Sequence, residues 1–324
     1  MNKIFQKIIN DPILLFMLPL SLIPLIIIII ISPIIRIRIA LLHSDRLGHF
    51  TANTELYLCE QDLNKSKKRQ IDLHYLIKTP SIYEALIKGI SRRACNNQIA
   101  RMWKRELNIL PFFLLRPLDL IIRSFKGLSS FHALAARGGN RDLDNLLKDS
   151  APHLSFTSEE DRHGKATLIS MGMPEGAKFV CLNLRDNAYH SSESLAYHDY
   201  RNTDIQNYVL ASEELCSRGY FVIRMGKKVN TAILSDNPMI IDYATNGMRS
   251  DFMDVYLGAK CNFCITVGSG FDGICDIFRR PIVEVNHVPI CSIYSWGTVL
   301  PVSLFKHFID IKTNRELTLN EIIK

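Results

Sequence analysis

The sequence predicts an α/β protein with two Rossmann-like domains that face a cleft, preceded by an N-terminal membrane helix. Strand-like and helix-like runs alternate after residue 36, and the alternation restarts near residue 173 after a polar connection. We therefore expect residues 1–35 to form a membrane anchor, 36–150 an α/β domain, 151–172 a linker, and 173–324 a second α/β domain.

The N-terminal segment carries no charged residue from Pro12 to Ile35. This length matches the roughly 20 apolar residues that a membrane-spanning helix needs. Pro19, Pro24 and Pro33 leave open a kinked or re-entrant segment. Residues 65–126 contain 14 Lys or Arg against 4 Asp or Glu, a net charge of +10. This charge favours contact with an anionic cytoplasmic leaflet.

The first domain begins with the pattern strand, helix, strand, helix. Strands are expected over residues 37–42 and 70–77, with helices up to about residue 63 and over 81–90 and 97–107. The loop after the first strand carries Asp45 and His49, either of which could take a proton from an acceptor hydroxyl. Alternatively, this loop serves only to start the next helix.

The second domain repeats the alternation, with strands expected over residues 179–184, 220–224 and 239–241 and helices over 204–218 and 250–259. Polar groups follow these strands, and the carboxyl ends of parallel strands meet at one edge of a sheet. We expect the following residues to gather there: Arg185, Asp186, Arg224, Gly226, Lys227, Asp242, Gly268, Ser269 and Gly270. Each arginine could instead form an ion pair, and Asp242 could cap a turn instead of binding a ribose.

The most informative stretch is residues 262–285, NFCITVGSGFDGICDIFRRPIVEV. An apolar strand stops at Gly268-Ser269-Gly270 and a helix follows. Backbone amides at such a turn, together with the positive end of a helix, suit a phosphate or pyrophosphate. An ordinary strand-to-helix turn is the alternative, because a lone GSG is a weak motif.

The cysteines and acidic pairs do not predict a metal site. The eight cysteines are too few for a dense disulfide framework in 324 residues, and Cys181 and Cys264 lie in apolar, strand-like runs. Cys261 and Cys264 form a CxxC with no second pair. The single DxD, Asp142 to Asp144, is interpreted as a helix start. Reduced cysteines favour the cytoplasmic side.

Several motifs together resemble a sparsely characterised family of bacterial glycosyltransferases over about residues 36–285. They are SDRLGHFTANTELYL, LRDNAY, YRNTDIQNY, RMGKK, IDYA, SDFMDVYLGAK, ITVGSGFDG and FRRPIVEVN. The resemblance implies a GT-B fold with an acceptor side in the first domain and a nucleotide-sugar site in the second. It also implies a distant likeness to fucosyltransferase-type enzymes, in which a strand-end arginine holds the donor diphosphate. Arg185 would be that residue, although LRD lacks the preceding His and the second Arg of that pattern.

The expected function is a membrane-associated, metal-independent hexosyltransferase or deoxyhexosyltransferase. It would move a sugar from a nucleotide-sugar to a lipid-linked or surface-polysaccharide acceptor. Asp45, His49 and Arg185 are the catalytic candidates. We expect no cofactor beyond the donor substrate, no nucleic-acid partner, and a place at the inner membrane with the catalytic domains in the cytoplasm. The alternatives are a nucleotide-sugar epimerase and a non-catalytic, membrane-tethered subunit of a polysaccharide assembly complex.

Overall fold

The computed structural model describes residues 12–63, 69–77, 94–133, 142, 144–188, 199–288 and 302–323. The chain divides into two compact units, Met1–Phe156 and Thr157–Lys324. The boundary falls inside the predicted linker, most of which is the helix α9 (Ser158–Ser170). The helix expected over residues 81–90 lies outside the described residues.

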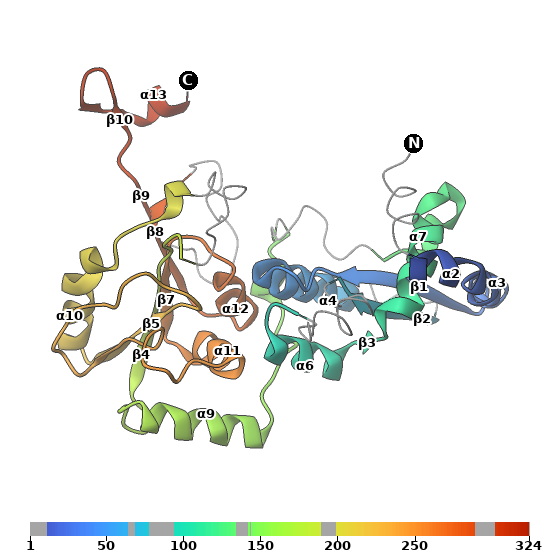
Figure 1. The fold of residues 1–324 in the computed structure, drawn as a ribbon, viewed down its shortest axis with the longest axis horizontal. Helices are drawn as coiled ribbons and strands as arrows, with labels where there is room; N and C mark the ends of the chain where they lie inside the picture. Colours follow the sequence, from blue (N-terminus) through green and yellow to red (C-terminus); the bar gives the residue numbers. More distant parts are fainter. Residues whose placement is uncertain are drawn as a thin grey trace. The chain divides into compact units, whose positions relative to one another are not determined.

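The first unit contains a parallel three-stranded sheet in the order β1 (Ile35–Leu42), β2 (Arg69–Leu76), β3 (Asn108–Ile109). Side chains alternate between the two faces along each strand. Ile39 and Tyr75 pack under α3 (Leu22–Ile31) and α7 (Phe112–Ser124). Ala40 instead packs against Tyr57 of α4 (Thr54–Leu63). The sheet therefore has helices on both faces (Figure 1).

The remaining described elements of this unit are short. They are α2 (Pro12–Leu20), the π-helical turn η1 (His49–Asn53), α6 (Asn97–Glu106), the 3₁₀ turn η2 (Lys126–Phe131) and α8 (Leu146–Asp149). The predicted helix start at Asp142 is confirmed, because its carboxylate accepts hydrogen bonds from the amides of Leu146 and Leu147 at 2.7 and 2.9 Å.

The apolar N-terminal segment is two helices instead of the single helix that we expected. α2 contains Pro19 and ends at Leu20, and α3 starts after Ser21, whose hydroxyl donates to the Met17 carbonyl at 2.8 Å. Pro24 lacks the amide hydrogen that would bond to the Leu20 carbonyl in a continuous helix, which explains why the segment is interrupted there. Among the helices in the described ranges, none combines the length and the apolar character needed to cross a membrane.

The second unit contains a six-stranded, all-parallel sheet in the order β6-β5-β4-β7-β8-β9. The strands are β4 (Lys178–Asn183), β5 (Tyr220–Met225), β6 (Ile240–Ile241), β7 (Phe263–Thr266), β8 (Ile282–His287) and β9 (Val302–Phe305). The chain first adds strands on one side of β4 and then on the other. This is the 3-2-1-4-5-6 order of the doubly wound Rossmann sheet.

Helices cover both faces of this sheet (Figure 1). The 3₁₀ turn η4 (Ile205–Tyr208) and α10 (Val209–Ser217) pack on the face that carries Leu182 and Val222. α11 (Asp251–Lys260) and α12 (Asp272–Ile277) pack together, and a Cβ at Gly258 would lie 2.8 Å from Ile274. A small hairpin of β10 (Ile309–Asp310) and β11 (Arg315–Glu316), followed by α13 (Leu319–Ile323), ends the described chain.

The two cysteines assigned to the core are confirmed there, since Cys181 and Cys264 are both 0% exposed. Cys261 directly follows α11 and does not enter β7, and its thiol donates to the Gly258 carbonyl. All seven cysteines in the described ranges are free thiols.

Candidate nucleotide-binding site

The strand order of the second unit changes direction between β4 and β7, which lie side by side. In doubly wound sheets the carboxyl ends of the strands at such a switch point are where ligands bind. Asn183 is the last residue of β4, and its amide donates to Ser269 Oγ at 2.7 Å and to Thr266 Oγ1 at 3.3 Å. Polar side chains from both strands therefore meet at the switch point.

The Gly268-Ser269-Gly270 turn leaves β7 at this position. Gly268 has a φ of +77°, a left-handed conformation that favours glycine. The Ser269 amide donates to Asp272, and the other carboxylate oxygen of Asp272 accepts a hydrogen bond from Thr266 at 2.6 Å. We expected the backbone amides of this turn to bind a phosphate, but the Ser269 amide already donates to the Asp272 carboxylate.

Asp272 is 2% exposed. Burial raises the pKa of its carboxyl to about 7, while the hydrogen bonds from Thr266 and Ser269 oppose that rise. Because α12 has only six residues, its dipole is a weak source of positive potential. The cationic side chains near the turn are consequently more important for an anionic ligand than the helix end.

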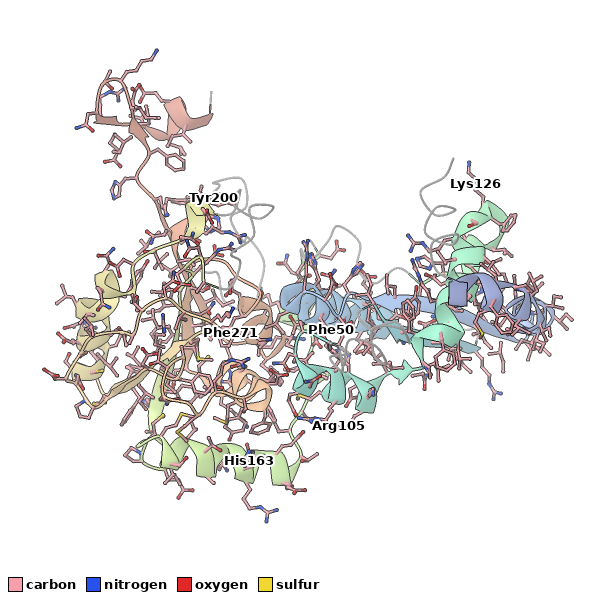
Figure 2. All side chains as sticks on the ribbon, viewed as in Figure 1. Phe50, Arg105, Lys126, His163, Tyr200 and Phe271 are labelled. Carbon is pink, nitrogen blue, oxygen red and sulfur yellow. The ribbon has the colours of Figure 1, made fainter. Side chains whose placement is uncertain are left out.

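Residues 199–203, which we call the crossing segment, contact the ends of four neighbouring strands. Arg201 donates to the Gly268 carbonyl after β7 at 2.8 Å. Arg185, after β4, donates from Nε to Asn202 at 3.2 Å. Asn286 of β8 donates to Thr203 at 3.1 Å, and Lys306, after β9, donates to the carbonyls of Tyr200 and Asn202 at 2.5 and 3.2 Å. Tyr200 is labelled in Figure 2.

The crossing segment therefore brings three cations to one edge of one sheet. Arg185, Arg201 and Lys306 are each half-buried. Arg185 and Lys306 donate hydrogen bonds to the crossing segment, whereas Arg201 lies in the segment and donates to the Gly268 carbonyl. Of these three, sequence reasoning selected only Arg185. Lys306 follows a strand that the sequence analysis did not predict, and Arg201 precedes a helix, so neither lies after a recognised strand.

Arg224 and Asp242 do not join this group. The Arg224 side chain is 3% exposed, and its guanidinium donates to Asp242 at 3.3 Å and to the Thr231 carbonyl at 3.1 Å. Arg224 is paired in register with Leu182, which places it on the opposite face of the sheet from Asn183. The predicted convergence of Arg224 with Ser269 is therefore wrong, and the ion-pair alternative holds.

Asp186 and Gly226 have structural partners. The Asp186 carboxylate accepts hydrogen bonds from the amides of Ala188 at 3.0 Å and Asn230 at 2.7 Å, which ties together the loops after β4 and β5. A Cβ on Gly226 would lie 2.5 Å from a Val229 methyl carbon, so close packing accounts for this glycine. Lys227 lies half-buried in the loop after β5.

The two base candidates lie in the first unit, after the carboxyl end of β1. Asp45 is exposed. His49 is half-buried at the start of η1, and its Nδ1 lies 3.4 Å from the side-chain amide nitrogen Nδ2 of Asn53. Burial, with smaller contributions from His43 and Arg46, lowers the pKa of His49. A neutral imidazole at pH 7 is what a general base requires, and that role stays a prediction.

Comparisons with known proteins add likenesses in structure only. No family model matches the sequence, and no curated protein matches it. A glycosyl transferase family 9 structure from Veillonella parvula is 12% identical, with 84% of this chain and 87% of that chain covered and a TM-score of 0.48. E. coli ADP-heptose LPS heptosyltransferase II is 13% identical, with 84% and 91% covered and a TM-score of 0.45.

A third similar structure is an E. coli heptosyltransferase with ADP-2-deoxy-2-fluoro heptose. It is 9% identical, with 82% of this chain and 92% of that chain covered and a TM-score of 0.35. Identities and TM-scores in this range assign neither a family nor a reaction. The parallel α/β architecture therefore rests on the strand pairing of this chain itself.

Proposed function

We propose that this protein is a glycosyltransferase of GT-B type that uses a nucleotide-sugar donor and needs no metal for transfer. The observation that carries the proposal is the polar switch point between β4 and β7 in a sheet of Rossmann order. The motifs that resemble bacterial glycosyltransferases supply the reaction class, a hexosyl or deoxyhexosyl transfer.

In this proposal the donor diphosphate binds at the carboxyl edge, beside Arg185 and Arg201. Guanidinium groups offer forked donors that match phosphate oxygens. Their charge stabilises the departing nucleoside diphosphate while positive charge develops on the sugar. An acceptor hydroxyl then attacks the sugar carbon, and His49 or Asp45 takes its proton. The bond between the sugar carbon and the donor phosphate oxygen breaks, and a bond between the same carbon and the acceptor oxygen forms.

Changing Arg185 or Arg201 to alanine is expected to weaken donor binding about 10- to 100-fold, the loss typical of a hydrogen bond to a charged group. Titration calorimetry of the full chain against ADP-, UDP-, GDP- and CMP-sugars measures it. Arg218→Ala is the matched control, because Arg218, the residue directly after α10, is 67% exposed and pairs with Glu214 one turn away. Binding that is equally tight in the Arg185 and Arg201 variants, or heat from none of these donors, would contradict the proposal.

The same proposal includes an acceptor at the cytoplasmic leaflet of the inner membrane, where a lipid-linked or surface-polysaccharide precursor would be presented. α3 is apolar on every side, although only Leu25 and Ile28 are buried. Ile23, Ile26 and Ile30 remain 63%, 55% and 70% exposed. A helix that is hydrophobic all round is normally surrounded by protein or lipid.

Two further features support membrane contact. α7 packs against α2 and α3 and adds Phe113 and Leu114, which are 47% and 45% exposed. Arg123 and Lys126, at and just beyond the end of α7, are also exposed, and Lys126 is labelled in Figure 2. Apolar side chains bordered by basic groups are typical of a surface that lies in the interface of an anionic membrane. We infer that α2, α3 and α7 enter one leaflet.

The double variant Ile26→Glu, Ile30→Glu is expected to lower binding to anionic vesicles at least about 10-fold, since each buried isoleucine contributes about 1.5–3 kcal/mol. Co-sedimentation with phosphatidylglycerol-containing vesicles measures it. The control is Leu210→Glu, Leu234→Glu, two residues of the second unit that are 79% and 72% exposed. If both double variants sediment like the unaltered chain, lipid contact through α3 is excluded.

A further inference from the structure

Three potential metal ligands meet inside the first unit, whereas the donor is proposed to bind to the second. Glu55, Cys59 and His153 place one ligand atom each within 4.8 Å of the others. Glu55 and Cys59 lie one helical turn apart on α4, on the same side of the helix. His153 comes from the segment after α8, about a hundred residues later in the chain. The fold thus joins two distant segments through these side chains.

Burial makes this group unusual. Glu55 is 0% exposed and Cys59 is 1% exposed. A buried carboxylate loses its hydration, which is unfavourable unless a positive charge lies beside it. A basic atom, His153 Nδ1, lies 3.2 Å from the Glu55 carboxylate. A proton on this imidazole, or a cation among the three ligands, would provide a compensating charge.

The orientation of His153 is the one found around bound metals. Its Nδ1 points to Glu55, while its Nε2 lies 3.0 Å from the exposed carboxylate of Asp62. Metal-bound histidines usually donate their second N–H to a carboxylate in this way, which fixes the ring and strengthens it as a ligand. Ser150 Oγ is 3.0 Å from Cys59 Sγ, so a further oxygen is close to the group.

The chemistry of the donors narrows the choice of ion. One thiolate, one imidazole and one carboxylate form a mixed set that suits Zn²⁺, whereas Mg²⁺ and Ca²⁺ prefer oxygen ligands. Three protein ligands leave a fourth tetrahedral position for the Ser150 hydroxyl or a water molecule. We propose that Glu55, Cys59 and His153 form a zinc site that fastens α4 to the segment after α8, with Asp62 as the positioning residue for the imidazole.

The alternative to a bound zinc ion is a proton on the His153 imidazole. In the chain without metal, hydrogen bonds that the His153 imidazole donates to Cys59 and Glu55 raise its pKa to about 10. A buried ion pair would then hold the same segments together without zinc. The two states differ in metal content and in the spectrum of a substituted ion, so both can be measured directly on the full chain.

The first experiment removes metal from the full chain with a chelator and then adds Zn²⁺ alone. We expect one tightly bound zinc per chain by elemental analysis and a higher melting temperature than the metal-free chain, because a ligand of the folded state stabilises it. Co²⁺ in place of Zn²⁺ should give a thiolate-to-metal charge-transfer absorption in the near ultraviolet. A chain with neither stoichiometric zinc nor this absorption overturns the proposal without any variant.

Variants assign the ligands. Cys59→Ser and His153→Gln should each abolish the stoichiometric zinc, and Cys59→Ser should also abolish the charge-transfer absorption. Asp62→Asn should weaken zinc binding about 10- to 100-fold while keeping the absorption, as is typical for a group that orients a ligand. Cys216→Ser is the matched control, because Cys216 is 6% exposed but lies in the second unit. Zinc retained in both ligand variants, or lost in the Cys216 control, would overturn the assignment.

Discussion

Replacing Arg224 with alanine is expected to reduce the free energy of unfolding of the second unit by about 3 kcal/mol, the loss typical when one partner of a buried ion pair is removed. Asp242 would keep only the Ile233 amide, at 2.9 Å, and the Thr231 carbonyl would lose its guanidinium donor. Both losses loosen the loop between β5 and β6. Urea unfolding followed by circular dichroism measures the effect.

The matched change Arg218→Ala should cost less than about 0.5 kcal/mol, because an exposed pair one helical turn apart contributes little. A double-mutant cycle sharpens the test. Once Arg224 is alanine, removing Asp242 should cost clearly less than it does in the unaltered chain, since the two side chains act together. A small loss of stability accompanied by weak donor binding would instead return Arg224 to the ligand-binding residues.

Much of the architecture could be predicted from the sequence because local patterns encode it. Apolar runs such as residues 179–184 became strands of a parallel sheet, with β4 ending at Asn183. The glycine pair around Ser269 marked the end of β7, and the φ of Gly268 shows why glycine is required there. These features depend on side-chain periodicity and backbone conformation, which a single segment determines by itself.

The site was harder to predict because it depends on contacts between distant segments. Arg201 follows no recognised strand, yet the course of the crossing segment places its guanidinium on the Gly268 carbonyl, 67 residues further along the chain. Arg224 follows the rule for strand ends but points to the other face of the sheet, where Asp242 neutralises it. Side chains alternate between the two faces of a sheet, so the position of a residue within its strand decides which face its side chain reaches. An error of one residue in the predicted strand places the side chain on the wrong face.

The group of Glu55, Cys59 and His153 shows the same limitation. Glu55 lies in the first turn of α4, a position that acidic residues favour whether or not they bind a ligand. Its burial follows from the packing of α4 against α8. The spacing of Glu55 and Cys59 was visible in the sequence, whereas the arrival of His153 from the far end of the unit was not.

His74 is expected to make the first unit less stable in mild acid. The side chain lies on β2, is 1% exposed, and packs edge-on against Tyr57 with ring centroids 5.5 Å apart. Burial lowers the pKa of its imidazole to about 4, with the nearby Asp72 opposing the shift and Arg38 adding to it. Among the residues that the structure describes, neither ring nitrogen has a hydrogen-bond partner. A protonated imidazole in this position would therefore be poorly solvated.

The sign of the effect follows from comparing the folded and unfolded chains. Above about pH 6.5 the imidazole is neutral in both, so His74 contributes no pH dependence. Between about pH 6.5 and 4 the unfolded chain binds the proton and the folded chain does not, so stability falls as the pH falls. With these pKa values the loss at pH 5 is about 2 kcal/mol relative to pH 8.

His74→Leu should remove this part of the acid sensitivity, because leucine fills a similar volume and does not titrate. Urea midpoints of the full chain at several values between pH 8 and pH 5 measure it. His163→Leu is the matched control, since His163 is an exposed residue of α9 (labelled in Figure 2). If the midpoints of the His74 variant fall with pH as steeply as those of the control, the acid sensitivity originates elsewhere, and His74 must be solvated or paired in the folded chain.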